Sequence, residues 1–238
     1  MANTMRIAIL GETETAAQVV DALTTAGARV VAEVAEADIV LSISTPLLTL
    51  KTAREAVDEL AAGAVYVDAS GATPATARAL AEIFSHVLFA DAAFATGESL
   101  ALALSGSGAA RAAELLEPFA AVEVISDVPG QASARVVLRS MFDNAMAAVL
   151  VDTLWAAESL GQAKWMHNEI LHEFDTNTAS AAQSLLADTS VNFKRRQMDM
   201  QDVVELLSES GYESTMLAPI QFTHGRIMHS KKIPYAKG

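Results

Sequence analysis

The chain has 238 residues, 52% of them hydrophobic and 19% charged, which is enough apolar material for one large domain or two modest ones. Its net charge of −13 argues against a nucleic-acid partner, and the absence of cysteine excludes disulfides, thiolate metal sites and a cysteine nucleophile. The longest apolar run, within residues 145–154, is too short to span a bilayer, and the apolar start is unlike a signal peptide. We therefore expect a cytoplasmic protein that works away from membranes.

The first half of the chain alternates short apolar runs with helical patterns. Residues 5–10 are typical of a buried strand, Gly11 breaks that strand, and a helical pattern then runs to Gly27. Further strands are expected at 29–34, 38–44, 64–69, 86–90, 100–105 and 122–126, and further helices at 45–61, from 73 onward and at 109–119. This alternation predicts a parallel sheet covered by helices.

The second half is wholly helical. Pro129 and Gly130 bar a helix before residue 131 and Gly161 ends one, so 131–160 can form a single helix of about 45 Å. Further helices are expected at 164–174, 179–188, 193–210 and 217–229, followed by a solvated tail at 231–238. The prediction is an α/β fold: a Rossmann-like parallel-sheet domain, 1–129, followed by an all-α C-terminal domain, 130–238, through a long interdomain helix.

The turn after the first strand partly matches the G-x-G-x-x-G/A fingerprint of dinucleotide-binding folds. Gly11 and Ala16 occupy its first and third positions, but Thr13 stands where a bare glycine should let the pyrophosphate approach. Glu12 and Glu14 add two negative charges at the helix start, where they repel an anion. The alternative is that the same two residues only stabilise the first helical turn. Because of Thr13 and the two negative charges, we expect any cofactor site here to be weak.

Three more polar residues follow predicted strands. Glu33 can accept a ribose hydroxyl, as acids do at this place in NAD-binding folds, or be a surface charge on a short connection. Thr45 and Ser70 stand at the carboxyl ends of two strands, where open α/β sheets present ligands. Both can equally be helix or turn caps.

Several segments spread over nearly the whole chain carry a resemblance to a known group. They read MRIAILG, DIVLSISTP, VYVDASGATP, GQASARVVLRS and NFKRRQMDMQDVVELLSESG. With them the chain resembles the β-hydroxyacid dehydrogenase superfamily, which includes 6-phosphogluconate dehydrogenase and the imine reductases, and within it the members with a short C-terminal helical domain. The resemblance implies NAD or NADP as cofactor and a small hydroxyacid, ketone or imine as substrate.

The chain departs from that family's pattern in three places. Members carry an additional strand and helix before the strand at 38–44, in the piece that holds the adenosine end of the cofactor. Their small-residue substrate loop is replaced by residues 93–97, where Phe94 makes the wall more apolar. Counted from Gly130, the family's catalytic lysine falls at Val136 and its substrate-contacting asparagine at Ser140, and valine can neither give nor take a proton.

In the resembled fold the first turns of the long helix face the nicotinamide cleft. Arg139, Ser140, Asp143 and Asn144 are therefore candidate catalytic residues, with Arg139 placed to clamp a carboxylate or phosphate. The alternative is that Arg139 and Asp143 form an ordinary i,i+4 pair on a solvated surface.

Metal and nucleic-acid sites are not expected. His167 and His172 have a poor spacing for two ligands on one helical face, and the basic run 193–196 is short in an acidic chain. The leading hypothesis is an NAD(P)-dependent oxidoreductase that forms a homodimer through the apolar half of the long helix. The alternative is a fold relative that has lost dehydrogenase chemistry and binds a small ligand or a partner protein.

Overall fold

A computed structural model describes residues 5–95, 100–176, 179–230 and 233 of the chain. Thr96 and Gly97 of the predicted substrate loop, and most of the predicted tail, lie outside these residues. The chain divides into two compact units, Met1–Met141 and Phe142–Gly238. This division falls inside the long helix, twelve residues after the predicted boundary at 129/130, and the domain ranges 1–129 and 130–238 stay a prediction.

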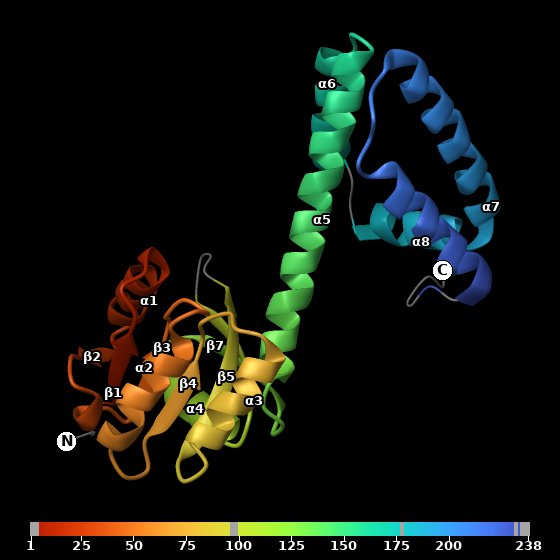
Figure 1. The fold of residues 1–238 in the computed structure, drawn as a ribbon. Coiled ribbons are helices and arrows are strands. Elements are labelled where there is room, and N and C mark those ends of the chain that lie inside the picture. Colours follow the sequence, from red (N-terminus) through yellow and green to blue (C-terminus); the bar gives the residue numbers. More distant parts are fainter. Residues whose placement is uncertain (1–4, 96–99, 177–178, 231–232, 234–238) are drawn as a thin grey trace. The chain divides into compact units, whose positions relative to one another are not determined.

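The first unit is built on one seven-stranded sheet with the order β2-β1-β3-β4-β5-β6-β7 (Figure 1). Its strands are β1 Arg6–Leu10, β2 Arg29–Val31, β3 Ile39–Ser42, β4 Val65–Asp68, β5 Leu88–Ala95, β6 Ala101–Ser105 and β7 Ala121–Ser126. β3 and β4 are buried along their whole length, as expected for parallel strands covered on both faces. The α/β fold class with a Rossmann-like sheet is therefore confirmed.

Helices cover both faces of the sheet and form two cores. α1 Glu14–Thr25 and α4 Ala109–Leu116 pack on one face, in a core that includes Leu23 and Leu116. α2 Thr49–Ala56 and α3 Pro74–Ile83 pack on the other face, where Tyr66, Phe84 and Phe89 stack. α2 begins four residues later than predicted, because residues 45–48 form a turn before it.

One pair of strands runs against the predicted parallel direction. β5 and β6 are antiparallel, with Asp91 paired to Ser105 and Ala95 paired to Ala101. Only residues 96–100 separate the two strands, whereas a parallel crossover needs about a dozen residues or more. The sheet is therefore mostly, and not wholly, parallel.

The sheet ends early on the β2 side. β2 is three residues long and pairs with β1, and residues 32–38 contain only the short 3-10 turn η1, Val34–Glu36, before β3 pairs with the other edge of β1. The strand and helix that the resembled family places here do not occur.

The second unit is helical. The long helix α5, Gln131–Ser159, crosses from the first unit into this one, and α6 Ala163–Thr176, α7 Ala179–Ser210 and α8 Leu217–Ser230 follow it (Figure 1). The predicted span of α5 is confirmed to within one residue. The helices predicted at 179–188 and 193–210 are one element with a non-helical residue, Asn192, between them. Among the described residues, no helix combines the length and apolar character needed to cross a bilayer.

A buried carboxylate fixes the start of α8 within the second unit. Asp152 of α5 is 6% exposed and accepts hydrogen bonds from Tyr212 Oη (2.9 Å), Ser214 Oγ (2.5 Å) and the Thr215 amide (3.1 Å). Ser214 Oγ in turn accepts the Leu217 amide (3.1 Å), so it caps the helix. Burial alone would raise the pKa of Asp152, but the hydrogen bonds from Ser214 and Tyr212 outweigh it and lower that pKa below the ordinary 3.8.

This arrangement predicts a loss of stability in acid. A carboxyl whose pKa is lower in the folded state stabilises that state fully above pH 3.8, and the stabilisation is lost as the pH falls through the lowered value. Urea unfolding of the Asp152→Asn variant should therefore show a weaker decline below pH 3.8 than the unmodified protein. Asp175→Asn, at an exposed position on α6, should leave the decline unchanged. Parallel pH profiles for Asp152→Asn and the unmodified protein would contradict the prediction.

Candidate functional site

A pocket of about 340 Å³ opens at the carboxyl ends of the central strands, and we call it the switch-point pocket. β1 lies between β2 and β3, so the chain reverses its direction of growth across the sheet at this point. Ligands of open α/β sheets bind in the crevice outside such a point. Its lining is Thr13, Thr15, Ile43, Ser44, Thr45, Pro46, Ala69, Ser70, Gly71, Ala92, Phe94 and Val136.

Gly11 lets the turn after β1 pass close to the end of β3. Its φ is +130°, and a Cβ built there would lie 2.4 Å from the Ile43 carbonyl oxygen. A side chain can therefore not be placed at this position without moving backbone.

Thr13 uses its hydroxyl inside the protein. Thr13 Oγ1 accepts the Ala16 amide (3.0 Å) as the N-cap of α1 and donates to the Ile43 carbonyl (3.2 Å). Ala16 is buried in the core beneath the helix, while Glu12 and Glu14 are exposed. The residue in the second glycine position thus carries a side chain that ties α1 to the end of β3.

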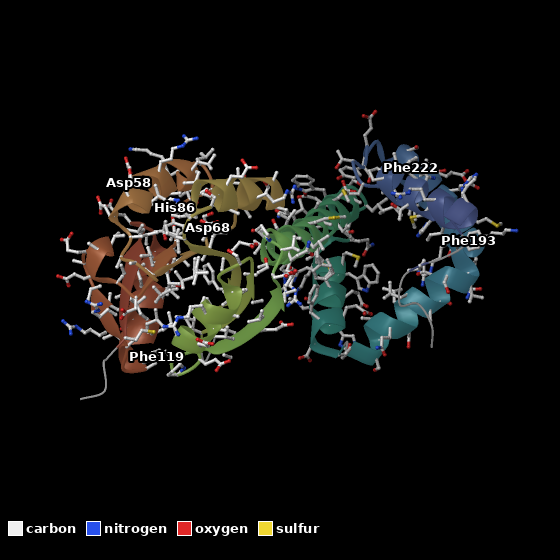
Figure 2. All side chains as sticks on the ribbon, turned by 90° about the horizontal axis from the view of Figure 1, so that it is seen from below. Asp58, Asp68, His86, Phe119, Phe193 and Phe222 are labelled. Atoms are coloured by element: carbon white, nitrogen blue, oxygen red, sulfur yellow. The ribbon has the colours of Figure 1, made fainter. Side chains whose placement is uncertain are left out.

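Ser70 is held by a buried carboxylate. Asp68 at the end of β4 is 2% exposed and lies inside the sheet unit, whereas Asp58 lies at its exposed periphery (Figure 2). Ser70 Oγ (3.0 Å) and Thr49 Oγ1 (2.7 Å) both donate to Asp68. Burial raises the pKa of Asp68, although these two hydrogen bonds oppose the shift. Ser70 Oγ also accepts the Ala72 amide (3.3 Å), so its position on the pocket wall is fixed.

Ser44, which sequence reasoning missed, has a different environment. It lines the switch-point pocket and is 9% exposed, yet its Oγ has no hydrogen-bond partner among the described residues. A buried hydroxyl without a partner costs free energy unless a ligand or water satisfies it. Its position directly before Thr45, at the end of a strand, is the signal that could have identified it.

Asp91, also missed, fixes the start of α5. This fully buried residue of β5 accepts the Gly130 amide, the Ser133 amide and Ser133 Oγ, each at 2.8 Å, and Ser105 Oγ at 2.5 Å. It thereby satisfies backbone amides that every helix start leaves unpaired. One turn later Val136 lines the pocket.

The predicted site residues are only partly brought together. Thr13, Thr45 and Ser70 line the switch-point pocket, with Gly11 in the turn beneath it. Glu33 is exposed two residues after β2 and is not among the lining residues. The structure therefore gathers the polar residues at strand ends and leaves Glu33 apart from them.

The predicted catalytic residues lie elsewhere on α5. Arg139 lines a second pocket of about 490 Å³, whose wall also holds Val136 and the ion pair of Arg135 with Glu123 (2.6 Å). Ser140 is exposed at the end of the first unit, and Asp143 and Asn144 are exposed at the start of the second. All four residues make polar or electrostatic interactions. Within the described ranges, no cluster of three or more residues could hold a metal ion.

The chain thus combines a Rossmann-like sheet unit, with a pocket at its switch point, and a helical unit. No protein-family model matches it. An uncharacterized 28.5 kDa protein from Methanothermus fervidus is 25% identical over 188 residues, which cover 77% of this chain and 73% of the relative.

Solved structures share the fold over almost the whole chain. A conserved protein of unknown function, described as structurally similar to 3-hydroxyacid dehydrogenases, is 23% identical with a TM-score of 0.59 and covers 98% of this chain and 100% of its own. A reductive aminase from Aspergillus terreus in complex with NADPH is 13% identical with a TM-score of 0.73, covering 96% and 95%. An imine reductase from Streptomyces aurantiacus is 14% identical with a TM-score of 0.68, covering 98% and 97%. The chain has the fold of 3-hydroxyacid dehydrogenase-like proteins and imine reductases.

Proposed function

We propose that the protein is an NAD(P)-dependent oxidoreductase acting on a small hydroxyacid, ketone or imine. The observation that carries the proposal is the hydroxyl-lined pocket at the switch point, where open α/β sheets bind ligands. The fold shared with the NADPH-bound reductive aminase supports a nicotinamide cofactor.

The pocket suits the nicotinamide-ribose part of such a cofactor. The hydroxyls of Ser44, Thr45 and Ser70 offer polar contacts, and Ala92, Phe94 and Val136 offer apolar wall for a ring. When bound, the nicotinamide supplies or accepts the hydride. The fit is poorer at the pyrophosphate position, where Thr13 replaces glycine.

The proposed polar contacts to substrate are the four α5 residues Arg139, Ser140, Asp143 and Asn144. Arg139 is the cation of this set and suits a carboxylate or phosphate, because its guanidinium can bind either with two parallel hydrogen bonds. Val136 can transfer no proton, so the acid that serves the reaction must be another residue, for which Asp143 is the proposed choice.

Cofactor consumption tests the proposal. NADH and NADPH oxidation is measured with panels of small ketones, 2-oxoacids and cyclic imines. With an anionic substrate, Arg139→Ala should lower kcat/KM by about tenfold or more with little change in Tm, and Arg139→Lys should restore only part of it. A lower Tm with unchanged kcat/KM would show that Arg139 only pairs with a neighbour.

The second candidate is a relative without dehydrogenase chemistry that binds a small ligand or a partner protein. Thr13 and Val136 favour it, because they occupy the pyrophosphate and proton-transfer positions of the resembled family. If neither NADH nor NADPH binds in calorimetric titration, this second candidate is supported and the oxidoreductase is rejected.

We also propose a homodimer formed by the second unit. Large apolar side chains of this unit are more than half exposed, among them Phe142, Trp155, Trp165, Phe174, Met198 and Phe222. A monomer rarely exposes so much apolar surface.

Light scattering should therefore give twice the 25.0 kDa chain mass at micromolar protein. Trp155→Glu should shift the mass toward the monomer, because a buried charge at the interface is costly. Leu47→Glu, at a 94% exposed position of the first unit, serves as the matched control and should leave the mass unchanged. A monomer mass for the unmodified protein would rule out this assembly.

A further inference from the structure

We infer that the switch-point pocket recognises the nicotinamide-ribose half of a dinucleotide and gains little from the adenosine half. A nicotinamide mononucleotide is then bound nearly as tightly as the whole cofactor. This inference rests on the proposed function, and it assigns that function a ligand requirement that differs from that of an intact dinucleotide fold.

The first observation is the early end of the sheet beyond β1. In a complete dinucleotide fold the adenosine lies over the strands on this side of the switch point. Here that side consists of β2 alone, whose last ladder pair is Ala8 with Val31, followed by the η1 turn. The switch-point pocket takes none of its lining from β2 or from residues 32–38.

The charges at this edge disfavour a phosphate on the adenosine ribose, although an acid such as Glu33 can accept a ribose hydroxyl. Glu33 stands two residues beyond Val31, the last residue of β2 that pairs with β1. Both Glu33 and Glu36 are exposed, and residues 30–38 contain no lysine or arginine. These carboxylates repel phosphate, and a 2′-phosphate on the ribose most of all.

The second observation concerns the junction between the two halves. A pyrophosphate binds the unpaired amides at the start of a helix, but Thr13 Oγ1 already accepts the Ala16 amide of α1. The exposed carboxylates of Glu12 and Glu14 flank the same turn. This turn therefore offers a diphosphate one amide fewer and two repelling charges, which weakens the binding of the group that would connect the adenosine.

The third observation is an unpaired buried hydroxyl, that of Ser44, on the side of the pocket assigned to the nicotinamide-ribose half. Ser44 lies beyond Gly11 on the β3 side, and its buried Oγ has no partner among the described residues. With Thr45 and Ser70 it lines the part of the pocket to which we assign the nicotinamide-ribose half. A ribose hydroxyl or carboxamide that pairs with Ser44 Oγ relieves the cost of burying it.

Calorimetric titration of the full chain with NADH, NADPH, reduced nicotinamide mononucleotide and ADP-ribose tests the inference. We expect the mononucleotide to bind within about threefold of NADH, ADP-ribose to bind at least about thirtyfold more weakly, and NADPH to bind no more tightly than NADH. ADP-ribose equal to NADH, or NADH more than about tenfold tighter than the mononucleotide, overturns the inference while the proposed function stands. Binding of none of the three nicotinamide compounds overturns both.

Two serine variants separate ligand binding from structure. Ser44→Ala should raise the Tm of the free protein, because a buried unsatisfied hydroxyl is removed, and should weaken NADH and the mononucleotide alike by about three- to tenfold. Ser42→Ala is the matched control, because Ser42, the last residue of β3 and two residues before Ser44, is fully buried and does not line the pocket. It should change neither affinity. Unchanged nicotinamide affinities in Ser44→Ala overturn the role assigned to this residue and the inference with it.

Discussion

Replacing Asp91 by alanine should lower the free energy of unfolding by about 3–5 kcal/mol. The carboxylate is 0% exposed and accepts two backbone amides and two hydroxyls. Its removal leaves these donors buried without partners, and each such group costs about 1–3 kcal/mol before the structure relaxes. Urea denaturation followed by circular dichroism measures the loss.

Two variants frame this result. Asp91→Asn keeps one acceptor oxygen and should cost about half as much as alanine. Asp127→Ala, at an exposed position, should change stability by less than about 0.5 kcal/mol. A loss below about 1 kcal/mol in Asp91→Ala would mean that water replaces the carboxylate at the start of α5.

The damage should extend to the ligand site. Asp91 holds the Gly130 and Ser133 amides, and Val136, one turn further along α5, lines the switch-point pocket and the pocket that Arg139 also lines. Faster hydrogen exchange at Ser133 in Asp91→Asn, with exchange in α2 unchanged, would localise the effect to this helix start.

The long elements could be predicted from sequence because their limits are local. Pro129 and Gly130 precede α5, and Gly161 follows it with a φ of +70° that few other residues adopt. The direction of β6 was not accessible from periodicity, since an apolar strand looks the same in either direction. The length of the connection at 96–100 was the better guide.

The residues of the candidate site could also be predicted only in part from the sequence. Thr13, Thr45 and Ser70 could be named because strand ends can be read from the sequence. Asp91 could not, since its partners at Gly130 and Ser133 lie 39 and 42 residues away and only the folded sheet brings them close. The single hydroxyl of Thr13 shows the limit most clearly. The fingerprint shows that this residue departs from glycine. It does not show that the hydroxyl caps α1 and donates to the Ile43 carbonyl.

That double role shapes the second large prediction, in which Glu12→Gly, Thr13→Gly and Glu14→Gln are combined to rebuild the phosphate turn. Each exposed carboxylate at a helix start interacts by roughly 0.3–1 kcal/mol, and the bare backbone adds a closer approach. Affinity for NADH should rise by about ten- to a hundredfold, because each 1.4 kcal/mol is a factor of ten.

The mononucleotide distinguishes this repair from a general gain in binding. It lacks the second phosphate and the adenosine, so its affinity should rise far less than that of NADH. Thr13→Ser is the matched control, because serine keeps the hydroxyl that accepts the Ala16 amide and donates to the Ile43 carbonyl. It should leave both affinities and the Tm close to those of the unmodified protein. The prediction is wrong if the unmodified protein already binds NADH at micromolar concentration and the triple variant binds it no more tightly. In that case Glu12, Thr13 and Glu14 do not obstruct the pyrophosphate, because the diphosphate reaches the amides of α1 although Thr13 caps this helix.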